Sequence, residues 1–373
     1  MTMFLGCNLD AESVRHILNT LPSYNDGIER PLGLSMQPEA AIVFGEITGV
    51  TPTQYWENMI NSLLLSSISG GTDYVPYKGW QLIPFIISDE KIDVGYGYNI
   101  PSGTTVVENW PLSQYGLSEC VLYDNYLMER TDTYTFTPVA YLDFDSVEAI
   151  RDIAMLVGIE ACLETNFPEL TAVYGLFAEA QFSFFDCQLR NLRFDMMSFY
   201  GCEYLSYFNS SLHSLVVSME TFGHCISLTK FDSDLRSLCF AESMFNGCES
   251  LTSFTPKLHS LGDYEKSYQE YLQGAEKITG SLEEVPTLEE FIAFFPIARD
   301  MFRDCQLDAA SVENILTSIP EWNDGIYREL GMTIQSGEAA EKFGEITGII
   351  PASTDEVEVP FKGWNVKVNL FSV

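Results

Sequence analysis

Apolar residues in the middle of the chain recur at a fixed step of 23 residues, with polar positions between them. The step holds for one row of phenylalanines, one row of cysteines and three rows of leucines. These rows are Phe199, Phe222 and Phe245; Cys202, Cys225 and Cys248; Leu205, Leu228 and Leu251; Leu189, Leu212, Leu235 and Leu258; and Leu192, Leu215, Leu238 and Leu261. Such a period, with leucines at fixed offsets, predicts a solenoid of stacked leucine-rich coils that share one core.

Each coil is expected to contain two short strands and a corner at a Phe-x-Gly-Cys step, as in Phe245–Cys248. A divergent coil is predicted at Leu272–Thr279, where Ala275 takes the cysteine position. Residues 262–271 before it are expected to form a surface excursion, and Met301–Cys305 restores the corner.

A second, larger repeat brackets the array, because residues 3–52 match residues 301–351. Asp10 and its counterpart Asp308 are each expected to cap the start of a short amphipathic helix. An Asn-Asp-Gly turn, a strand, a second helix and a final strand complete each copy. Each copy ends on a Val-Pro-aromatic-Lys-Gly-Trp motif, at Val75–Trp80 and Val359–Trp364. Terminal modules of this kind are expected to cover the exposed end of an array.

Two stretches between the first module and the array differ in character. Short apolar runs with Gly and Pro turns predict a β-rich insert over residues 81–140. Residues 146–164 read as an amphipathic helix, with Asp145 and Glu148 as a capping box. The predicted domains are residues 1–80 (terminal module), 81–140 (insert), 141–305 (solenoid) and 306–373 (C-terminal module). The fold class is an α/β repeat.

Charge narrows the range of partners. The chain carries 53 acidic and 19 basic residues, a net charge of −34. Nucleic acid and anionic membranes should repel such a chain, so neither is expected as a partner. Residues 1–7 lack the features of a secretory signal, and no apolar run is long enough to cross a membrane, so no membrane insertion is expected.

The chain has nine cysteines, and five of them are expected to be buried free thiols that act as small apolar residues. Cys7, Cys202, Cys225, Cys248 and Cys305 share one position of the repeat. No metal site is predicted, because ligand spacings are lacking, and no cofactor motif occurs. His224 lies beside Cys225, but a packed corner would keep that pair from acting as a catalyst. The sequence therefore predicts a protein that is not an enzyme.

One row of the repeat is a candidate contact site. Arg190, His213, Arg236 and His259 occupy one position in four successive repeats and should point outward. Stacking would place them about 4.8 Å apart, as a stripe for an acidic partner or an anionic glycan. The alternative is a solvated face on which each group pairs with a nearby carboxylate.

Two other groups of residues allow a functional and a structural interpretation. Aromatic residues of the insert could form an interface or a sugar-binding surface, or they could pack a small core. They are Tyr96, Tyr98, Trp110, Tyr115, Tyr123 and Tyr126. Acidic clusters lack the calcium-loop pattern and are expected to be solvated charge. They are Asp143 with Asp145, Glu283 with Glu284, Glu289 with Glu290, and Asp355 with Glu356.

The corner Met-Phe-x-Gly-Cys-x-Ser-Leu-Thr at Met244–Thr252, with its paired Leu-x-Ser-Leu strand, resembles the BspA-type leucine-rich repeats. The terminal modules look like units that follow such arrays in surface and virion-associated proteins of gut bacteria and their phages. The resemblance covers about two thirds of the chain. It implies attachment to a protein or a surface glycan, or a structural role, at a virion or cell surface. It implies no catalytic residues. The alternative is an intracellular, cytoplasmic scaffold that binds other proteins.

The first module has no array before it in this sequence. Its edge at Met3, Phe4 and Cys7 should therefore be buried on another part of the chain, on a second subunit or on further coils. Self-association through this N-terminal module is one expectation.

Overall fold

The structure is a computed structural model. It describes residues 4–25, 30–50, 52, 75–86, 100–108, 120–130, 136–151, 156, 159–282 and 285–371. The chain forms a mixed α/β fold with parallel and mixed sheets. It divides into two compact units, Met1–Val94 with Arg130–Thr137, and Gly95–Glu129 with Pro138–Val373.

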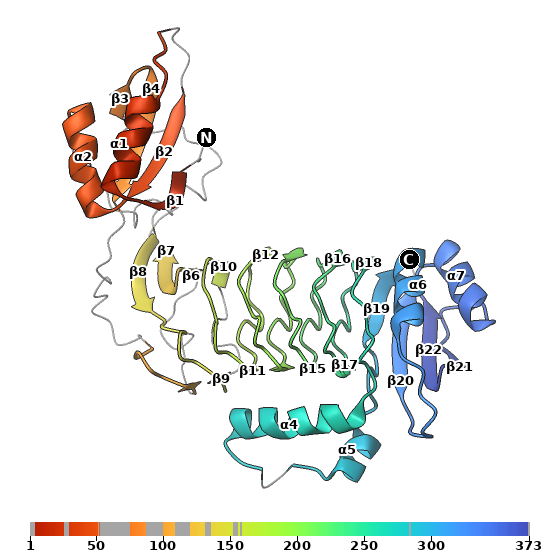
Figure 1. The fold of residues 1–373 in the computed structure, drawn as a ribbon. Helices are drawn as coiled ribbons and strands as arrows, with labels where there is room; N and C mark the ends of the chain where they lie inside the picture. The colour runs from red at the N-terminus through yellow and green to blue at the C-terminus, as the bar shows by residue number, and fades with distance from the viewer. Residues whose placement is uncertain are drawn as a thin grey trace. The chain divides into compact units, whose positions relative to one another are not determined.

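The first unit contains the N-terminal module (Figure 1). Its elements are β1 (Phe4–Leu9), α1 (Ala11–Thr20), β2 (Pro31–Met36), α2 (Pro38–Thr48), β3 (Val75–Tyr77) and β4 (Trp80–Ile86). The sheet order is β1-β2-β4-β3, with β3 and β4 antiparallel. As predicted, Asp10 caps α1, since its side chain accepts a hydrogen bond from the Ser13 N–H at 2.8 Å.

The C-terminal module repeats this arrangement element by element, as the sequence match predicts. Its elements are β19 (Phe302–Leu307), α6 (Ala309–Ser318), β20 (Glu329–Ile334), α7 (Glu338–Thr347), β21 (Val357–Phe361) and β22 (Trp364–Leu370). The sheet order β19-β20-β22-β21 is that of the first module. Asp308 caps α6 through the Ser311 N–H, also at 2.8 Å.

The Lys-Gly-Trp motif ties the last hairpin of each module to its first helix. Lys362 and Gly363 adopt positive φ angles of 51° and 79°, which a tight turn between antiparallel strands requires. The Lys362 ammonium donates to three carbonyl oxygens at the C-terminal end of α6, where a cation is favoured. The indole of Trp364 donates to the Pro320 oxygen at 2.9 Å. Lys78 makes the same bonds at the end of α1.

Two six-stranded sheets and one two-stranded sheet lie before the C-terminal module, in the orders β14-β12-β10-β6-β7-β8, β17-β15-β13-β11-β9-β5 and β16-β18. Their strands are β5 (Val106–Val107), β6 (Cys120–Tyr123), β7 (Tyr126–Arg130), β8 (Phe136–Tyr141), β9 (Ala149–Ile150), β10 (Ile159–Leu163), β11 (Ala172–Tyr174), β12 (Phe184–Phe185), β13 (Phe194–Met196), β14 (Tyr207–Phe208), β15 (Val217–Met219), β16 (Lys230–Phe231), β17 (Phe240–Glu242) and β18 (Ser253–Phe254). Phe194 pairs with Val217 and Val217 with Phe240, in parallel strands 23 residues apart. The step of the sequence repeat is thus the step of strand pairing.

Stacked phenylalanines fill the core between these sheets. Phe199, Phe222 and Phe245 form one column whose neighbouring rings lie 5.1 and 5.4 Å apart and within 5° of parallel. A second column meets the first edge to face, and consists of Phe185, Phe208, Phe231 and Phe254. Edge-to-face and offset contacts between rings add to the free energy of burying them.

The cysteine row is buried, as predicted for free thiols that pack like small apolar residues. The thiols of Cys202, Cys225 and Cys248 each donate to a phenylalanine carbonyl of the preceding repeat, at 3.0–3.1 Å. Cys305 makes the same bond at 3.3 Å. The side chain of Cys7 lies outside the described part of the chain.

The prediction of a helix over residues 146–164 is wrong. The described part of this stretch contains β9 and β10, and Ala149 pairs with Ala172, one repeat later. The capping box does not form, because the Glu148 N–H donates to the Thr105 oxygen. Strand pairing at the 23-residue step therefore extends into this stretch, and it prevails over the local helical pattern.

The β-rich stretch predicted as an insert over residues 81–140 contributes strands to the two long sheets. Within it, β5 pairs in parallel with β9, and β6 pairs in parallel with β10. Residue 81 lies inside β4, which runs from Trp80 to Ile86 and belongs to the first module. The described strands of residues 100–129 therefore extend the two long sheets.

The divergent coil predicted at Leu272–Thr279 is also wrong, because those residues belong to helix α4 (Tyr264–Thr279). Asp263 caps its start and Gly280, at φ 75°, ends it. The helix packs against β9, β11, β13 and β15, as Figure 1 shows, and a short helix α5 (Leu288–Phe294) follows. The apolar residues of α4 recur at helical spacing, which favours helix over a further repeat.

Candidate functional site

The predicted row of basic residues lies on one edge of the repeat. Arg190, Arg236 and His259 are exposed and His213 is half-buried. The leucines on either side of each are buried, which confirms that the row points outward.

Each member of the row has a polar partner close by. The Arg190 Nε donates to the Gln188 amide oxygen at 3.2 Å, and Arg236 forms an ion pair with Asp234. The hydrogen bond from Arg236 lowers the pKa of the Asp234 carboxyl below its usual value. These contacts fit the alternative interpretation of the row, a solvated face with local pairing.

The two histidines are also engaged. The Nδ1 of His213 lies 2.9 Å from the Ser211 hydroxyl, and the Nδ1 of His259 lies 3.0 Å from the Ser318 carbonyl oxygen at the end of α6. The last member of the row therefore helps to hold the C-terminal module against the final repeat.

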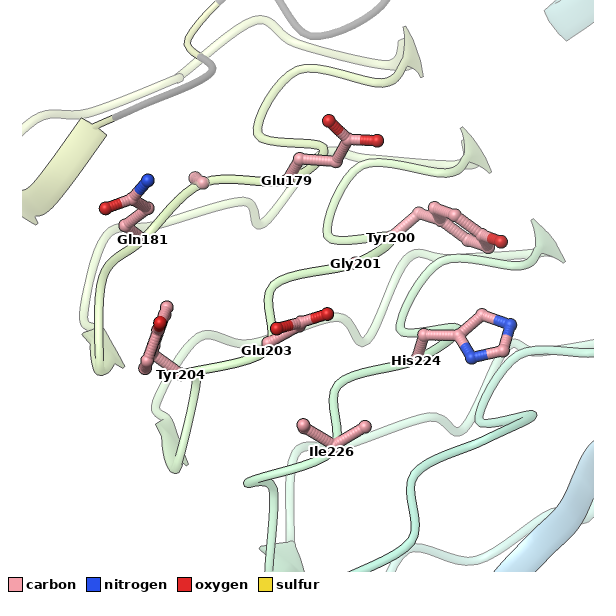
Figure 2. A pocket seen from close by; sticks show the side chains of 9 residues that line it. Glu179, Gln181, Tyr200, Gly201, Glu203, Tyr204, His224 and Ile226 are labelled. Carbon is pink, nitrogen blue, oxygen red and sulfur yellow. The ribbon is translucent and has the colours of Figure 1, made fainter. Parts of the chain in front are cut away.

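A different feature stands out on the corner of the repeat. Here three successive repeats surround an open hollow of about 530 Å³ (Figure 2). The hollow is lined by Glu179, Ala180, Gln181, Tyr200, Gly201, Glu203, Tyr204, His224 and Ile226. It lies outside the residues that the sequence singled out as contact candidates.

The backbone of this corner turns through the left-handed region in every repeat. Glu179, Gly201, His224 and Gly247 hold equivalent places in successive repeats, with φ angles of 60°, 70°, 59° and 75°. Glycine adopts these angles without strain, and other residues adopt them rarely. Gly201 lines the hollow together with Glu179 and His224, and a Cβ on Gly201 would lie 3.3 Å from the Glu179 Cγ, so the Glu179 side chain lies over this glycine.

Glycines also make room for the rings beside the hollow. A Cβ on Gly223 would lie 2.9 Å from the Tyr200 ring, and one on Gly247 would lie 2.6 Å from the Nδ1 of His224. Each ring thus lies over a glycine of the next repeat. The rings of Tyr200 and His224 meet edge to face, with centroids 5.3 Å apart.

The rim of the hollow combines exposed apolar side chains with carboxylates. Tyr204 is 60% exposed and Ile226 is 38% exposed. Glu179 and Glu203 are exposed and form no ion pair with any residue that the structure describes. None of the described lining residues is Lys or Arg. The hollow is therefore an aromatic surface with negative charge.

His224 and Cys225 are placed differently despite being neighbours. His224 is exposed, whereas Cys225 is fully buried and its thiol donates to the Phe199 oxygen. Burial raises the pKa of the Cys225 thiol well above its usual value. A thiolate in reach of solvent is therefore not formed at this corner.

The other candidates are only partly described. Among the aromatic residues, Tyr123 is buried in β6, and Tyr126 is half-buried with its ring centroid 4.8 Å from that of Tyr141. Tyr96, Tyr98, Trp110 and Tyr115 lie outside the described residues.

The acidic clusters differ in how far their side chains are exposed to solvent and in what they contact. Asp143 is buried rather than solvated, and its carboxylate accepts a hydrogen bond from the Asp145 N–H at 3.2 Å. Glu290 forms a capping box with Thr287, which lowers the pKa of its carboxyl. Asp355 and Glu356 are exposed as expected, whereas Glu283 and Glu284 lie outside the described residues.

Within the described ranges, no three His, Cys, Asp or Glu side chains lie close enough to hold a metal ion. The described helices include none that is both long and apolar enough to span a membrane. Comparison with protein families, curated proteins and solved structures found no match to this chain.

Part of the hollow could have been read from the sequence. The cysteine row places Glu203, Ile226 and Glu249 at one corner position, where an isoleucine between two glutamates is unusual. Glycines at 201 and 247 alternate with His224 at another position of the same corner. The side chains that close the hollow, Glu179 and Gln181, belong to a repeat that is one residue shorter at this corner, which breaks the simple step of 23.

Proposed function

We propose that the chain is a leucine-rich-repeat solenoid of the BspA type that serves as a non-enzymatic interaction protein. The observation that carries the proposal is the corner hollow, which spans three repeats and presents Tyr204 and Ile226 to solvent. A solenoid offers extended surfaces made from equivalent positions of successive coils. Exposed tyrosines are common binding determinants on such surfaces.

The preferred role is attachment or structural interaction at a phage virion or bacterial surface, with a protein or a glycan as partner. The resemblance of the Met244–Thr252 corner supports this role. The scaffold itself serves many partners, so the role depends on the surface chemistry of this chain. An intracellular scaffold is the second candidate. It is favoured by the eight described cysteines, all free and buried, because free thiols persist in a reducing compartment.

Location separates the two roles. In the native host, antibody against the purified chain should label virus particles or the outer face of intact cells. Fractionation followed by quantitative immunoblotting should find most of the chain in the fraction that contains the virus particles or the cell surface. Recovery of the chain in the cytoplasm alone, with no label on particles or cells, would establish the scaffold role in place of attachment.

A further inference from the structure

We propose that the corner hollow binds arginine side chains of a protein partner. This inference rests on the proposed interaction function and names the chemistry that the surface selects. A guanidinium group binds well where it can stack on an aromatic ring and pair with a carboxylate. Both groups line this one hollow of about 530 Å³.

The carboxylates supply the charge complement. Two other carboxylates that pack on the repeat have arginine partners, Glu270 in Arg193 and Glu242 in Arg299. Glu179 and Glu203 have no such partner among the described residues. They face the same hollow from neighbouring repeats, as Figure 2 shows.

The aromatic rings supply the flat face. Tyr204 is 60% exposed at the rim, beside Glu203. The ring of Tyr200 packs over the backbone of Gly223 and meets the ring of His224 edge to face. These two contacts fix its orientation. A ring that is already fixed loses little conformational freedom when a guanidinium stacks on it. A cation over such a ring is attracted at a partly desolvated site.

Binding of arginine in the hollow can be distinguished from general attraction of cations to the negatively charged chain. With a net charge of −34, every face should attract cations weakly over long distances. Salt near 0.15 M screens that attraction beyond about 8 Å. Direct stacking on Tyr204 and contact with Glu203 should survive this screening, so binding at physiological salt reports the hollow itself.

The test is fluorescence anisotropy with the labelled peptide (Gly-Arg)4 at about 0.15 M salt. The matched peptide (Gly-citrulline)4 keeps the shape of the side chains and removes their charge. We expect (Gly-Arg)4 to bind and the citrulline peptide not to bind. Glu203→Gln and Tyr204→Ser should each weaken binding about tenfold, because each removes one of the two contacts.

Glu249→Gln is the matched control, since Glu249 holds the place of Glu203 two repeats later and does not line the hollow. It should change the affinity less than about twofold. The double variant Arg190→Ser/Arg236→Ser should also bind as the unchanged chain does. An equal loss in Glu249→Gln and Glu203→Gln would overturn the proposal, because binding would then follow total charge.

The proposed function can survive failure of this inference, and the experiments separate the two. If a neutral glycan binds and Tyr204→Ser abolishes its binding while (Gly-Arg)4 does not bind, attachment stands and the arginine site is overturned. If (Gly-Arg)4 binds as expected while the chain is found only in the cytoplasm, the arginine site stands and attachment at a surface is overturned.

Discussion

Replacing Asp195 with Asn is expected to make the chain more stable at pH 8 and to leave its stability nearly unchanged at pH 4. Burial raises the pKa of Asp195 to about 7, against 3.8 for the free side chain. A difference of about three pH units corresponds to roughly 4 kcal/mol in the free energy of unfolding. Asn keeps the shape of the side chain and cannot ionise.

The position of Asp195 explains the shift. It lies fully buried in β13, paired with Val173 and Ser218 of the neighbouring strands. One carboxylate oxygen accepts the Ser198 N–H at 3.1 Å. The other has no hydrogen-bond partner among the described residues, and neither has the Ser198 hydroxyl. An ionised carboxylate at this place is poorly solvated, so the protonated form is favoured.

The direction in which stability changes with pH follows from proton binding to Asp195. Between pH 3.8 and about 7 the folded chain holds a proton on Asp195 that the unfolded chain has released. Stability therefore falls as the pH rises through this range and levels off above it. The Asn variant lacks this fall, so the difference between variant and wild type should grow from pH 4 to pH 8.

Urea unfolding monitored by circular dichroism at several pH values measures this difference directly. Asp232→Asn serves as control, because Asp232 is exposed and pairs only with the exposed Lys230 among the described residues. Its effect should stay within about 0.5 kcal/mol at every pH. A difference for Asp195→Asn that does not vary with pH would show that Asp195 is ionised in the folded chain.

Replacing Phe222 with Ala is expected to cost about 3–5 kcal/mol of stability, because it leaves a cavity in the middle of one phenylalanine column and beside the other. The ring is fully buried. It stacks on Phe199 and Phe245 at 5.1 and 5.4 Å, and it meets the edges of Phe208 and Phe231 at 4.9 and 5.2 Å. The loss is a large part of the stability of an ordinary domain.

Tyr207→Ala is the comparison for this variant. Tyr207 belongs to the repeat but is 56% exposed, so its loss should cost about 0.5 kcal/mol or less. Phe222→Leu should fall between the two, because it keeps most of the apolar volume. If Phe222→Ala and Tyr207→Ala lowered stability equally, the stacked column would not be the core of the repeat.

The sequence predicts those parts of the fold in which one residue type recurs at a fixed step. The rows of Phe222 and Cys225 follow directly from the period of 23 residues, and both rows are buried. The two terminal modules follow from their match, down to the caps at Asp10 and Asp308. In each case the local pattern and the tertiary packing favour the same structure.

Prediction from the sequence is wrong where a helical pattern and the 23-residue repeat favour different structures. Residues 146–164 carry a helical pattern, but Ala149 pairs with the strand one repeat later, and long-range pairing prevails. Residues 272–279 match the repeat in sequence, but a cap at Asp263 and a left-handed stop at Gly280 make residues 264–279 one helix. The hollow was missed for a related reason, because it depends on the absent side chain of Gly201 and on a repeat of different length.

Hydroxyl-radical footprinting of the chain with and without (Gly-Arg)4 tests most directly the claim that the corner hollow is the contact surface. We predict that the peptide protects Tyr200, Tyr204 and His224, which line the hollow, and leaves His213 and His259 of the basic row, which do not line it, unchanged. Protection of the row without the hollow, or equal protection of both, would contradict the account.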